Sequence, residues 1–327
     1  MNHLWKSNEK NNLPDFIIGG AMKSGTTTLH QILDKHPDVF IANDELGFYD
    51  MDSIIEHPDF NFFDEDGKWH TQKIDQDPTV AWKWYSDKFN DAKDGQIKGE
   101  DSTTYLSSLV AAKRISWQKK DIKMIFLLRH PTERTISNYF HLLKSGKAEY
   151  NLEETLQYNP YSIIRRSLYY EQLKNYYELL NTENIKIVLF EDLVTQPAHV
   201  LNDICTFLNL SFEKFSKDDL KLHSNKTLYP KSEKLQLKYN RLNRKLGKTR
   251  YSNFLPFKKN IQTNNIGIKQ KALKKIHKKI NPKHSNYKPN VNIETKKYLD
   301  NFFAYQLDGL DELTNKKIVE RWFPNHQ

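Results

Sequence analysis

The sequence predicts an α/β fold with a central, mainly parallel sheet flanked by helices. Apolar runs of strand length alternate along the chain with segments whose apolar residues recur at helical spacing. The clearest strand covers residues 123–128, which are almost continuously apolar, as expected of a strand covered on both faces. A second such run covers residues 185–190. Ligands bind at the carboxyl ends of parallel strands, so the residues that follow these runs are the first site candidates.

The first strand, predicted over residues 15–19, leads into a loop of small residues and then a helix. Residues 20–25 read Gly-Ala-Met-Lys-Ser-Gly, and the apolar residues Leu29, Ile32 and Leu33 follow at helical spacing. In such a strand–loop–helix unit, backbone N–H groups and the positive end of the helix dipole converge on one anion. The sequence therefore predicts a phosphate cradle here.

The remaining elements continue the alternation. Strands are predicted over 39–41 and 96–99, and helices over 131–145, 162–181, 197–208, 233–246, 269–280 and 294–313.

The domain organisation is predicted from composition along the 327 residues. Residues 1–13 are expected to form a flexible arm, and residues 14–327 a single domain. Within that domain, residues 211–290 are a basic cap or substrate region, and residues 291–327 a closing helix and tail. The basic region holds 22 Lys and Arg against 4 Asp and Glu, whereas the rest of the chain is net acidic. The positive charge is therefore a regional feature, and two interpretations stay open: a solvated lysine-rich surface, or a region that attracts an anionic ligand, nucleotide or polymer.

The number of cysteines and the hydropathy of the chain bear on disulfides, membrane spans and cellular location. Cys205 is the only cysteine, which excludes an intramolecular disulfide and a multi-cysteine metal site. No apolar run approaches the roughly 20 residues needed to cross a bilayer, so we expect no transmembrane segment. The polar N-terminus carries no secretory signal, and we expect a reducing, cytoplasmic location.

The cradle differs from the nucleoside-triphosphate cradle G-x-x-x-x-G-K-[ST]. Gly20 and Gly25 have its spacing, but Thr26 follows Gly25, and the lysine precedes it at Lys23. The most buried strand ends in the cation Arg129, where a triphosphatase would need an acid for magnesium. The pattern predicts that cations and amides hold phosphates without a metal. A small-molecule or nucleotide kinase that needs ATP and magnesium is the alternative.

Residues 23–27 (Lys-Ser-Gly-Thr-Thr) resemble the 5′-phosphosulfate loop of sulfotransferases that use PAPS (3′-phosphoadenosine 5′-phosphosulfate). Residues 129–140 are similar to the family's 3′-phosphate motif, with an arginine at the strand end and a serine, Ser137, two helical turns later. The resemblance covers most of residues 14–210 and the last 30 or so residues. It implies a P-loop nucleoside-triphosphate-hydrolase-like sulfotransferase fold.

Within the family, the chain resembles the branch of heparan-sulfate and bacterial carbohydrate sulfotransferases. That branch carries the loop K-E-x-H-F-F after the second strand, and its glutamate is the catalytic base. The matching residues here are 44–49, Asp-Glu-Leu-Gly-Phe-Tyr, so Glu45 takes the base position. Asp44 stands where lysine is usual, and Gly47 where histidine is usual. The resemblance implies an acceptor hydroxyl on a carbohydrate.

The resemblance also implies the roles of the site residues in an in-line displacement at sulfur. Lys23 stabilises the leaving oxygen and Glu45 takes the acceptor proton, with His130, Asp101 and Glu100 as alternatives for the base. The donor is PAPS, the product is 3′,5′-ADP, and no metal is required. The amides and hydroxyls of the cradle hold the 5′-phosphate, while a cation and a serine hold the 3′-phosphate. The residues predicted to bind the donor are Lys23, Ser24, Gly25, Thr26, Thr27, Thr28, Arg129 and Ser137.

A second class of function stays open at this point. The lysines of residues 211–290 could be the footprint of a polyanion-binding module that does not need Lys23. No aromatic–basic interleaving of a nucleic-acid module is present, and no nucleic-acid partner is expected. The oligomeric state is left open by the sequence.

Overall fold

The computed structural model divides the protein into two compact units that are interleaved in the sequence. Unit 1 consists of residues 1–129, 169–224 and 251–259, and unit 2 of residues 130–168, 225–250 and 260–327. Both units contain parts of the predicted single domain, which stays a prediction. The structure describes residues 2–8, 12–63, 67–216, 218–219, 228–246, 256–257, 268–285 and 289–324.

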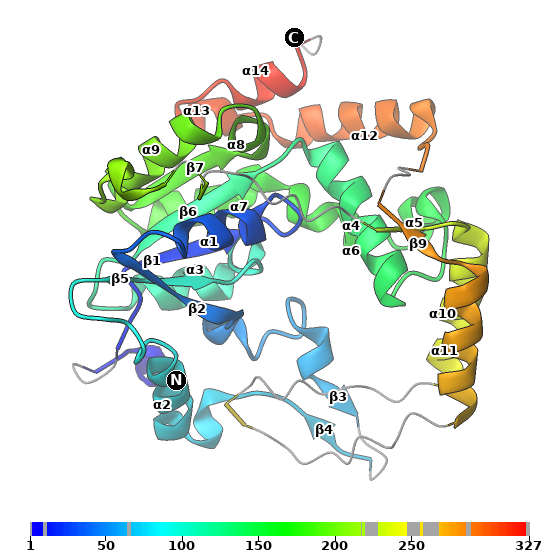
Figure 1. The fold of residues 1–327 in the computed structure, drawn as a ribbon, viewed down its shortest axis with the longest axis horizontal. Coiled ribbons are helices and arrows are strands. Elements are labelled where there is room, and N and C mark those ends of the chain that lie inside the picture. Colours follow the sequence, from blue (N-terminus) through cyan, green and yellow to red (C-terminus); the bar gives the residue numbers. More distant parts are fainter. Residues whose placement is uncertain are drawn as a thin grey trace. The chain divides into compact units, whose positions relative to one another are not determined.

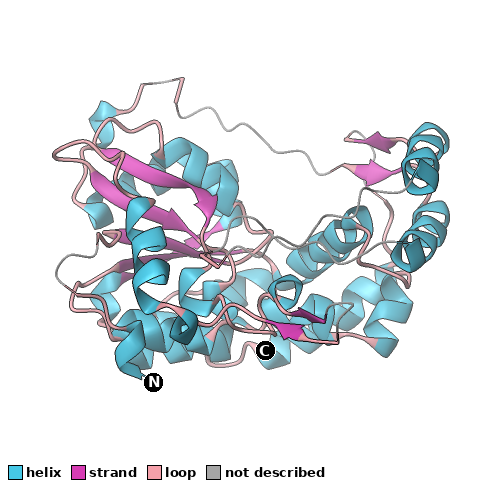
Figure 2. Cartoon of the chain, turned by 90° about the horizontal axis from the view of Figure 1, so that it is seen from below, coloured by secondary structure: helices cyan, strands magenta, loops and turns pink. Residues whose placement is uncertain are grey.

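Unit 1 is built around a five-stranded sheet in the order β2-β5-β1-β6-β7, in which every pair of neighbours is parallel (Figures 1 and 2). The strands are β1 (Phe16–Gly20), β2 (Val39–Glu45), β5 (Ile97–Asp101), β6 (Lys123–Leu128) and β7 (Ile185–Leu189). The predicted parallel sheet is confirmed. The second strand continues to Glu45, beyond the predicted end.

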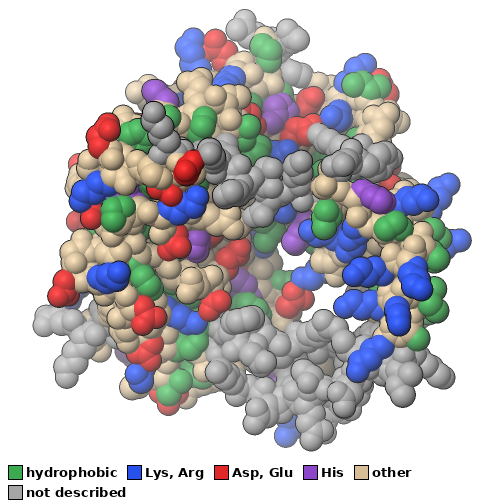
Figure 3. Space-filling view, viewed as in Figure 1, with side chains coloured by type: hydrophobic (Ala, Val, Ile, Leu, Met, Phe, Trp, Pro, Cys, Tyr) green, Lys and Arg blue, Asp and Glu red, His purple; other side chains and the backbone are tan. Residues whose placement is uncertain are grey.

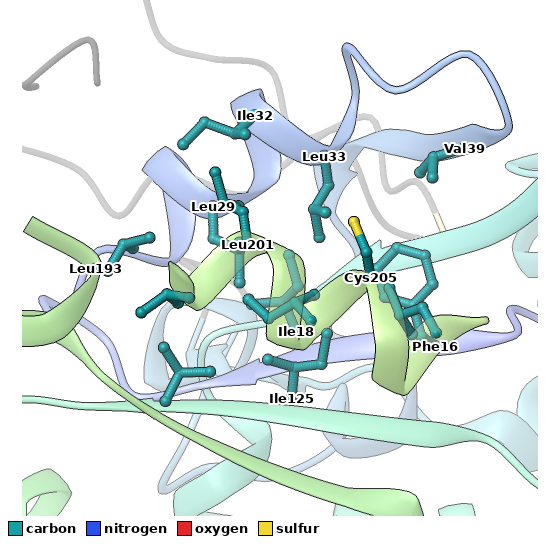
Figure 4. Packing of buried hydrophobic residues seen from close by; sticks show 14 of the residues in the cluster. Phe16, Ile18, Leu29, Ile32, Leu33, Val39, Ile125, Leu193, Leu201 and Cys205 are labelled. Carbon is teal, nitrogen blue, oxygen red and sulfur yellow. The ribbon is translucent and has the colours of Figure 1, made fainter. Parts of the chain in front are cut away.

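Helices cover both faces of this sheet. On one face, α1 (Thr26–Leu33) and α9 (Pro197–Leu208) pack on alternate strand residues such as Ile125, as Figure 4 shows. The neighbouring residue Phe126 points to the opposite face, where its ring lies 4.6 Å from that of Tyr176. The core is therefore divided between the two faces of the sheet.

The other elements of unit 1 are short apart from three helices. They are η1 (Asn2–Trp5), η2 (Phe48–Asp50), η3 (Pro58–Phe60), β3 (Phe62–Phe63), β4 (Trp69–His70), η4 (Ile74–Gln76), α2 (Pro78–Asp87), η5 (Tyr105–Ser107), α3 (Leu109–Ser116), α7 (Tyr169–Leu179), η7 (Thr182–Asn184), α8 (Phe190–Thr195) and η8 (Phe212–Lys214).

Residues 2–5 differ from the flexible arm that the sequence predicts. The turn η1 buries Trp5, which is 4% exposed, and the Arg114 guanidinium lies 3.5 Å from the centre of its ring. The indole N–H of Trp82 donates to the Leu4 carbonyl at 2.9 Å. Burial of a large aromatic ring is the physical reason for this docking.

Unit 2 is mainly helical. Its elements are α4 (Pro131–Ser145), α5 (Leu152–Tyr158), α6 (Tyr161–Ile164), η6 (Arg165–Ser167), β8 (Tyr229–Pro230), α10 (Glu233–Leu246), α11 (Ile268–Ile280), β9 (Lys283–His284), α12 (Ile293–Gln306), α13 (Leu310–Thr314) and α14 (Ile318–Trp322). None of the described helices, in either unit, is long and apolar enough to cross a bilayer.

Two helices predicted as continuous are interrupted. The helix expected over 162–181 is divided into α6, η6 and α7, because the backbone leaves helical geometry at Leu168, where the chain passes from unit 2 to unit 1. The helix expected over 294–313 is divided into α12 and α13, because Gly309 has a φ of 82°. Tyr298, predicted on its apolar face, is 63% exposed.

Lysine and arginine side chains gather on the surface of unit 2 over α10 and α11, as Figure 3 shows. Their positive charges accumulate: burial and the neighbouring Lys144 and Lys274 lower the pKa of Lys283. The exposed basic residues among those described on α10 and α11 are Lys234, Lys238, Arg241, Lys271, Lys274, Lys275, Lys278 and Lys279. Much of the predicted basic region lies outside the described residues.

Candidate active site

The carboxyl ends of the five strands of unit 1 lie at one edge of the sheet, because all the strands are parallel. The cradle follows β1 at this edge, and Arg129 and Phe190 directly follow β6 and β7. Glu45 and Asp101 are the last residues of β2 and β5, and they are register partners. The sheet thus gathers two cations of the predicted site with its carboxylates.

Glycine and left-handed backbone shape the cradle. Lys23 has a φ of 71° and Gly25 a φ of 92°, so the loop reverses within three residues. A Cβ atom at Gly25 would lie 2.8 Å from a ring carbon of Phe190. The start of the loop is fixed because the Ala21 N–H donates to the Leu127 carbonyl at 2.8 Å.

The first turn of α1 supplies the donors of the cradle. The amides of Thr26, Thr27 and Thr28 begin the helix and have no helical acceptor. The Ser24 N–H, which is predicted to bind the 5′-phosphate with the other cradle amides, instead donates to the Ala21 carbonyl at 3.1 Å. The Ser24 hydroxyl is fully buried and has no hydrogen-bond partner among the described residues. Ser24 can therefore serve an anion through its hydroxyl.

Lys23 and Arg129 meet at the cradle. Arg129 Nη1 donates to the Lys23 carbonyl at 3.3 Å, and the guanidinium lies 4.9 Å from the centre of the Phe190 ring. The Tyr169 hydroxyl donates a hydrogen bond of 2.9 Å to the Arg129 carbonyl. Sequence reasoning missed Phe190. Its position as the first residue after a buried strand is the signal that could have found it.

Ser137 and His130 are residues of unit 2. Ser137 lies on α4 and is 8% exposed, and its predicted role at the 3′-phosphate stays a prediction. His130 packs against Phe323, with ring centres 5.1 Å apart, and Nε2 lies 3.3 Å from the Trp322 carbonyl oxygen. These contacts give His130 a packing role inside its own unit.

Glu45 lies at the exposed end of β2, close to the cradle loop. Its Oε2 accepts a hydrogen bond of 3.0 Å from the Thr103 hydroxyl. The Thr103 carbonyl oxygen would be 2.9 Å from a Cβ at Gly20, so Thr103 lies directly against the start of the cradle. Asp44 instead forms an ion pair of 3.0 Å with Lys88. The structure therefore connects Glu45, through Thr103, with the phosphate cradle.

His57, which sequence reasoning did not single out, lies beside the loop that follows Glu45. A Cβ at Gly47 would lie 3.0 Å from His57 Cε1, so the imidazole fills the space beside the position where the related loops carry histidine. Asp50, which is fully buried, holds His57 Nε2 at 2.7 Å, and the ring stacks on Phe60 at 4.5 Å. His57 lies in an irregular segment, and no local pattern predicts its position.

The other carboxylates considered as bases are buried. Asp101 is 3% exposed and lies 3.4 Å from His30 Nδ1, and burial raises its pKa. Glu100 is fully buried and accepts hydrogen bonds from Ser102 and two tyrosines. An acceptor hydroxyl must reach its base within hydrogen-bond distance, and burial disfavours both groups for this role.

Comparison with known proteins identifies the family. The model of the sulfotransferase family matches residues 14–214. Mouse (Mus musculus) heparan sulfate glucosamine 3-O-sulfotransferase 5 is 28% identical over 209 residues, which are 61% of this chain and 54% of that protein. Human (Homo sapiens) heparan sulfate glucosamine 3-O-sulfotransferase 3A1 is 29% identical over 207 residues, 61% of this chain and 45% of that protein. The chain spans about half the length of these curated relatives.

A solved structure shows the same fold. The crystal structure of a sulfotransferase from Alicyclobacillus acidocaldarius matches with a TM-score of 0.58 and 22% identity, over 95% of this chain and 98% of that one. The predicted P-loop-like sulfotransferase fold is confirmed, as is the resemblance to the heparan-sulfate branch. With the family model covering more than half of its length, the chain belongs to the sulfotransferase family.

Proposed function

We propose that the protein transfers the sulfuryl group of PAPS to a hydroxyl group of a carbohydrate and releases 3′,5′-ADP. The contact of Arg129 with the Lys23 carbonyl carries this proposal, because it places the Arg129 guanidinium against the cradle loop that carries Lys23. A phosphate-transferring enzyme would hold magnesium with an acid near this position. The carbohydrate is proposed from the relatives, which are named as heparan sulfate glucosamine sulfotransferases.

The cradle fits the phosphate groups of the donor. The buried Ser24 hydroxyl lacks a partner among the described residues, and the amides at the start of α1 are free of helical acceptors. Thr26 and Thr27 add hydroxyl groups, and the helix dipole favours a negative charge. We assign Arg129 of unit 1 to the 3′-phosphate, and the role of Ser137 stays a prediction from the sequence.

PAPS, when bound, supplies a sulfuryl group attached to a phosphate oxygen. Lys23 stabilises the negative charge that develops on this oxygen as its bond to sulfur breaks. Glu45 accepts the proton of the acceptor hydroxyl, whose oxygen forms the new bond to sulfur. The Thr103 hydroxyl orients the Glu45 carboxylate by its hydrogen bond of 3.0 Å. Positioning and electrostatics provide the rate enhancement.

Acceptor binding is proposed on the side of Glu45, where His57 and Asp50 form a polar pair next to Gly47. Because Asp50 fixes one ring nitrogen of His57, the imidazole presents a defined edge. This edge would bind an acceptor hydroxyl.

Thermal unfolding with 3′,5′-ADP tests the donor assignment. A ligand that binds only the native state raises the melting temperature, and at one hundred times its dissociation constant it adds about 2.7 kcal/mol to the free energy of unfolding. We expect this increase with 3′,5′-ADP, equally with and without magnesium. Arg129→Ala is the matched control and should reduce the increase. A shift seen only with ATP and magnesium would instead support the kinase alternative.

A further inference from the structure

Three hydroxyl groups converge on the carboxylate of Glu100 inside unit 1. Glu100 lies near the end of β5 and is fully buried. Its Oε1 accepts hydrogen bonds from Ser102 Oγ and from the Tyr105 hydroxyl, both at 2.7 Å. Its Oε2 accepts a hydrogen bond from the Tyr85 hydroxyl. Both carboxylate oxygens thus accept hydrogen bonds from protein donors, and the side chain is not reached by solvent.

Each of these side chains also holds one residue of the segment 47–49, which follows Glu45 and Leu46. The Gly47 N–H donates to Ser102 Oγ at 2.9 Å. The Tyr49 N–H donates to the Tyr105 hydroxyl oxygen at 3.1 Å. The Phe48 ring stacks on the Tyr85 ring, with centres 4.2 Å apart and planes at 11°. Glu100 is therefore linked to each of these three residues through a different side chain: Ser102, Tyr105 or Tyr85.

The direction of the hydrogen bonds depends on the charge of Glu100. An ionised carboxylate only accepts, so the Ser102 and Tyr105 hydroxyls must donate to it, and their oxygens are left to accept the loop amides. Such chains of hydrogen bonds strengthen one another in a buried environment. A protonated carboxyl or an amide at this position brings a donor that would compete with the hydroxyl protons.

We propose that Glu100 is a positioning residue that holds residues 47–49 and thereby fixes the place of the Glu45 carboxylate at the end of β2. The sheet register supports this, because Glu45 is paired with Asp101, the neighbour of Glu100. The proposal rests on the proposed function only for the role of Glu45 as the base. The organisation of the loop by Glu100 is independent of the reaction.

The environment makes this device sensitive to pH. Burial raises the pKa of Glu100 to about 7, although the three hydroxyl groups lower it. The ionisable groups that interact with it are Tyr85 of α2, Tyr105 of η5, Tyr176 of α7, and Tyr49 and Asp50 of η2. The charge of Asp50 raises the pKa of Glu100 further. The carboxylate form, which orders the loop, is therefore populated above about pH 7.

Hydrogen exchange at single amides tests the positioning directly. At pH 8, Glu100→Gln should raise the exchange rates of the Gly47 and Tyr49 amides at least tenfold. Ser102→Ala should expose mainly the Gly47 amide, and Tyr105→Phe mainly the Tyr49 amide. Ile204→Ala, a core substitution on the α1–α9 side of the sheet, is the control for general destabilisation. Unchanged protection of both amides in Glu100→Gln would overturn the proposal.

Kinetics separate the positioning role from a merely structural one. In the wild type, kcat for sulfuryl transfer should rise with pH around a midpoint near 7. Glu100→Gln should lower kcat at least tenfold, keep the KM for PAPS and remove this rise. An active wild type whose kcat and pH profile survive the substitution would contradict the positioning role. A wild type without transfer activity would contradict the proposed function, while the exchange rates still decide the role of Glu100.

Discussion

At the scale of single residues, the cradle couples its two cations through backbone geometry. Lys23 holds a left-handed conformation with φ of 71°, which turns its carbonyl toward Arg129 Nη1. Arg129 is itself held by Tyr169 and by the face of Phe190. Because Arg129 donates to the backbone carbonyl of Lys23, a side-chain substitution at Lys23 keeps this hydrogen bond, whereas a substitution at Arg129 removes it. The two substitutions also differ in function, because only Lys23 is proposed to act on the leaving oxygen.

Lys23→Ala should lower kcat by about 10²–10³-fold, the usual loss when one donor to a developing negative charge is removed. The affinity for 3′,5′-ADP should change much less, because cradle amides and Arg129 remain. Steady-state kinetics and calorimetric titration measure the two effects. Lys23→Arg, which keeps the charge but not the ammonium geometry, is the control and should be intermediate. Full turnover in Lys23→Ala would show that another group stabilises the leaving oxygen.

His57→Gln should raise the KM for the acceptor several-fold and leave the KM for PAPS unchanged. The amide of glutamine can still donate to the buried Asp50 carboxylate, so the fold is preserved while the imidazole edge is lost. Separate titrations of donor and acceptor in initial-rate assays give both constants. An altered KM for PAPS with an unchanged KM for the acceptor would contradict this prediction and indicate that His57 contacts the donor.

At the scale of elements, β1 and β5 approach closely because β5 carries a glycine. A Cβ at Gly99 would lie 2.4 Å from the ring of Phe16, which is fully buried. Gly99→Ala should therefore reduce the free energy of unfolding by about 1–3 kcal/mol through overpacking, as measured by urea denaturation. Phe16→Leu in the same chain should recover part of the loss. Equal stability of wild type and Gly99→Ala would mean that the ring can move aside freely.

The elements that the sequence predicts well are those whose patterns are local. The apolar run of β6 and Pro131 at the start of α4 are visible without tertiary contacts. The interruption at Leu168 is different, because Ser167 donates to the Pro131 carbonyl at 3.0 Å, a residue 36 positions away. Such long-range bonds override a local helical pattern.

The residues of the candidate site also fall into two groups, those that local sequence predicts and those that tertiary packing places. Arg129 directly follows β6, Lys23 lies in the loop after β1, and Glu45 is the last residue of β2. The topology of a parallel sheet places these strand ends at one edge. His57 and the partners of Glu100 reach the site through tertiary packing, which no spacing in the sequence encodes. Sequence patterns therefore indicate the donor side more completely than the acceptor side.

At the scale of the whole molecule, charge is distributed unevenly along the chain. The exposed lysines of α10 and α11 belong to unit 2, whereas Lys23 and Arg129 belong to unit 1. Burial, and after it the charges of Lys144 and Lys274, lower the pKa of Lys283, and an anion would relieve the repulsion among these lysines. Polyanion binding by the basic region stays a prediction that can accompany transferase activity rather than replace it.

The interleaving of the two units has a consequence for synthesis on the ribosome. The strand β7 borders β6 in the sheet, yet residues 130–168, which belong to the other unit, are translated between them. Until residue 189 has emerged, the apolar strand β6 is an open edge that a neighbouring nascent chain could pair with. Translation of residues 130–168 thus lengthens the time during which this strand edge is exposed to pairing with other chains.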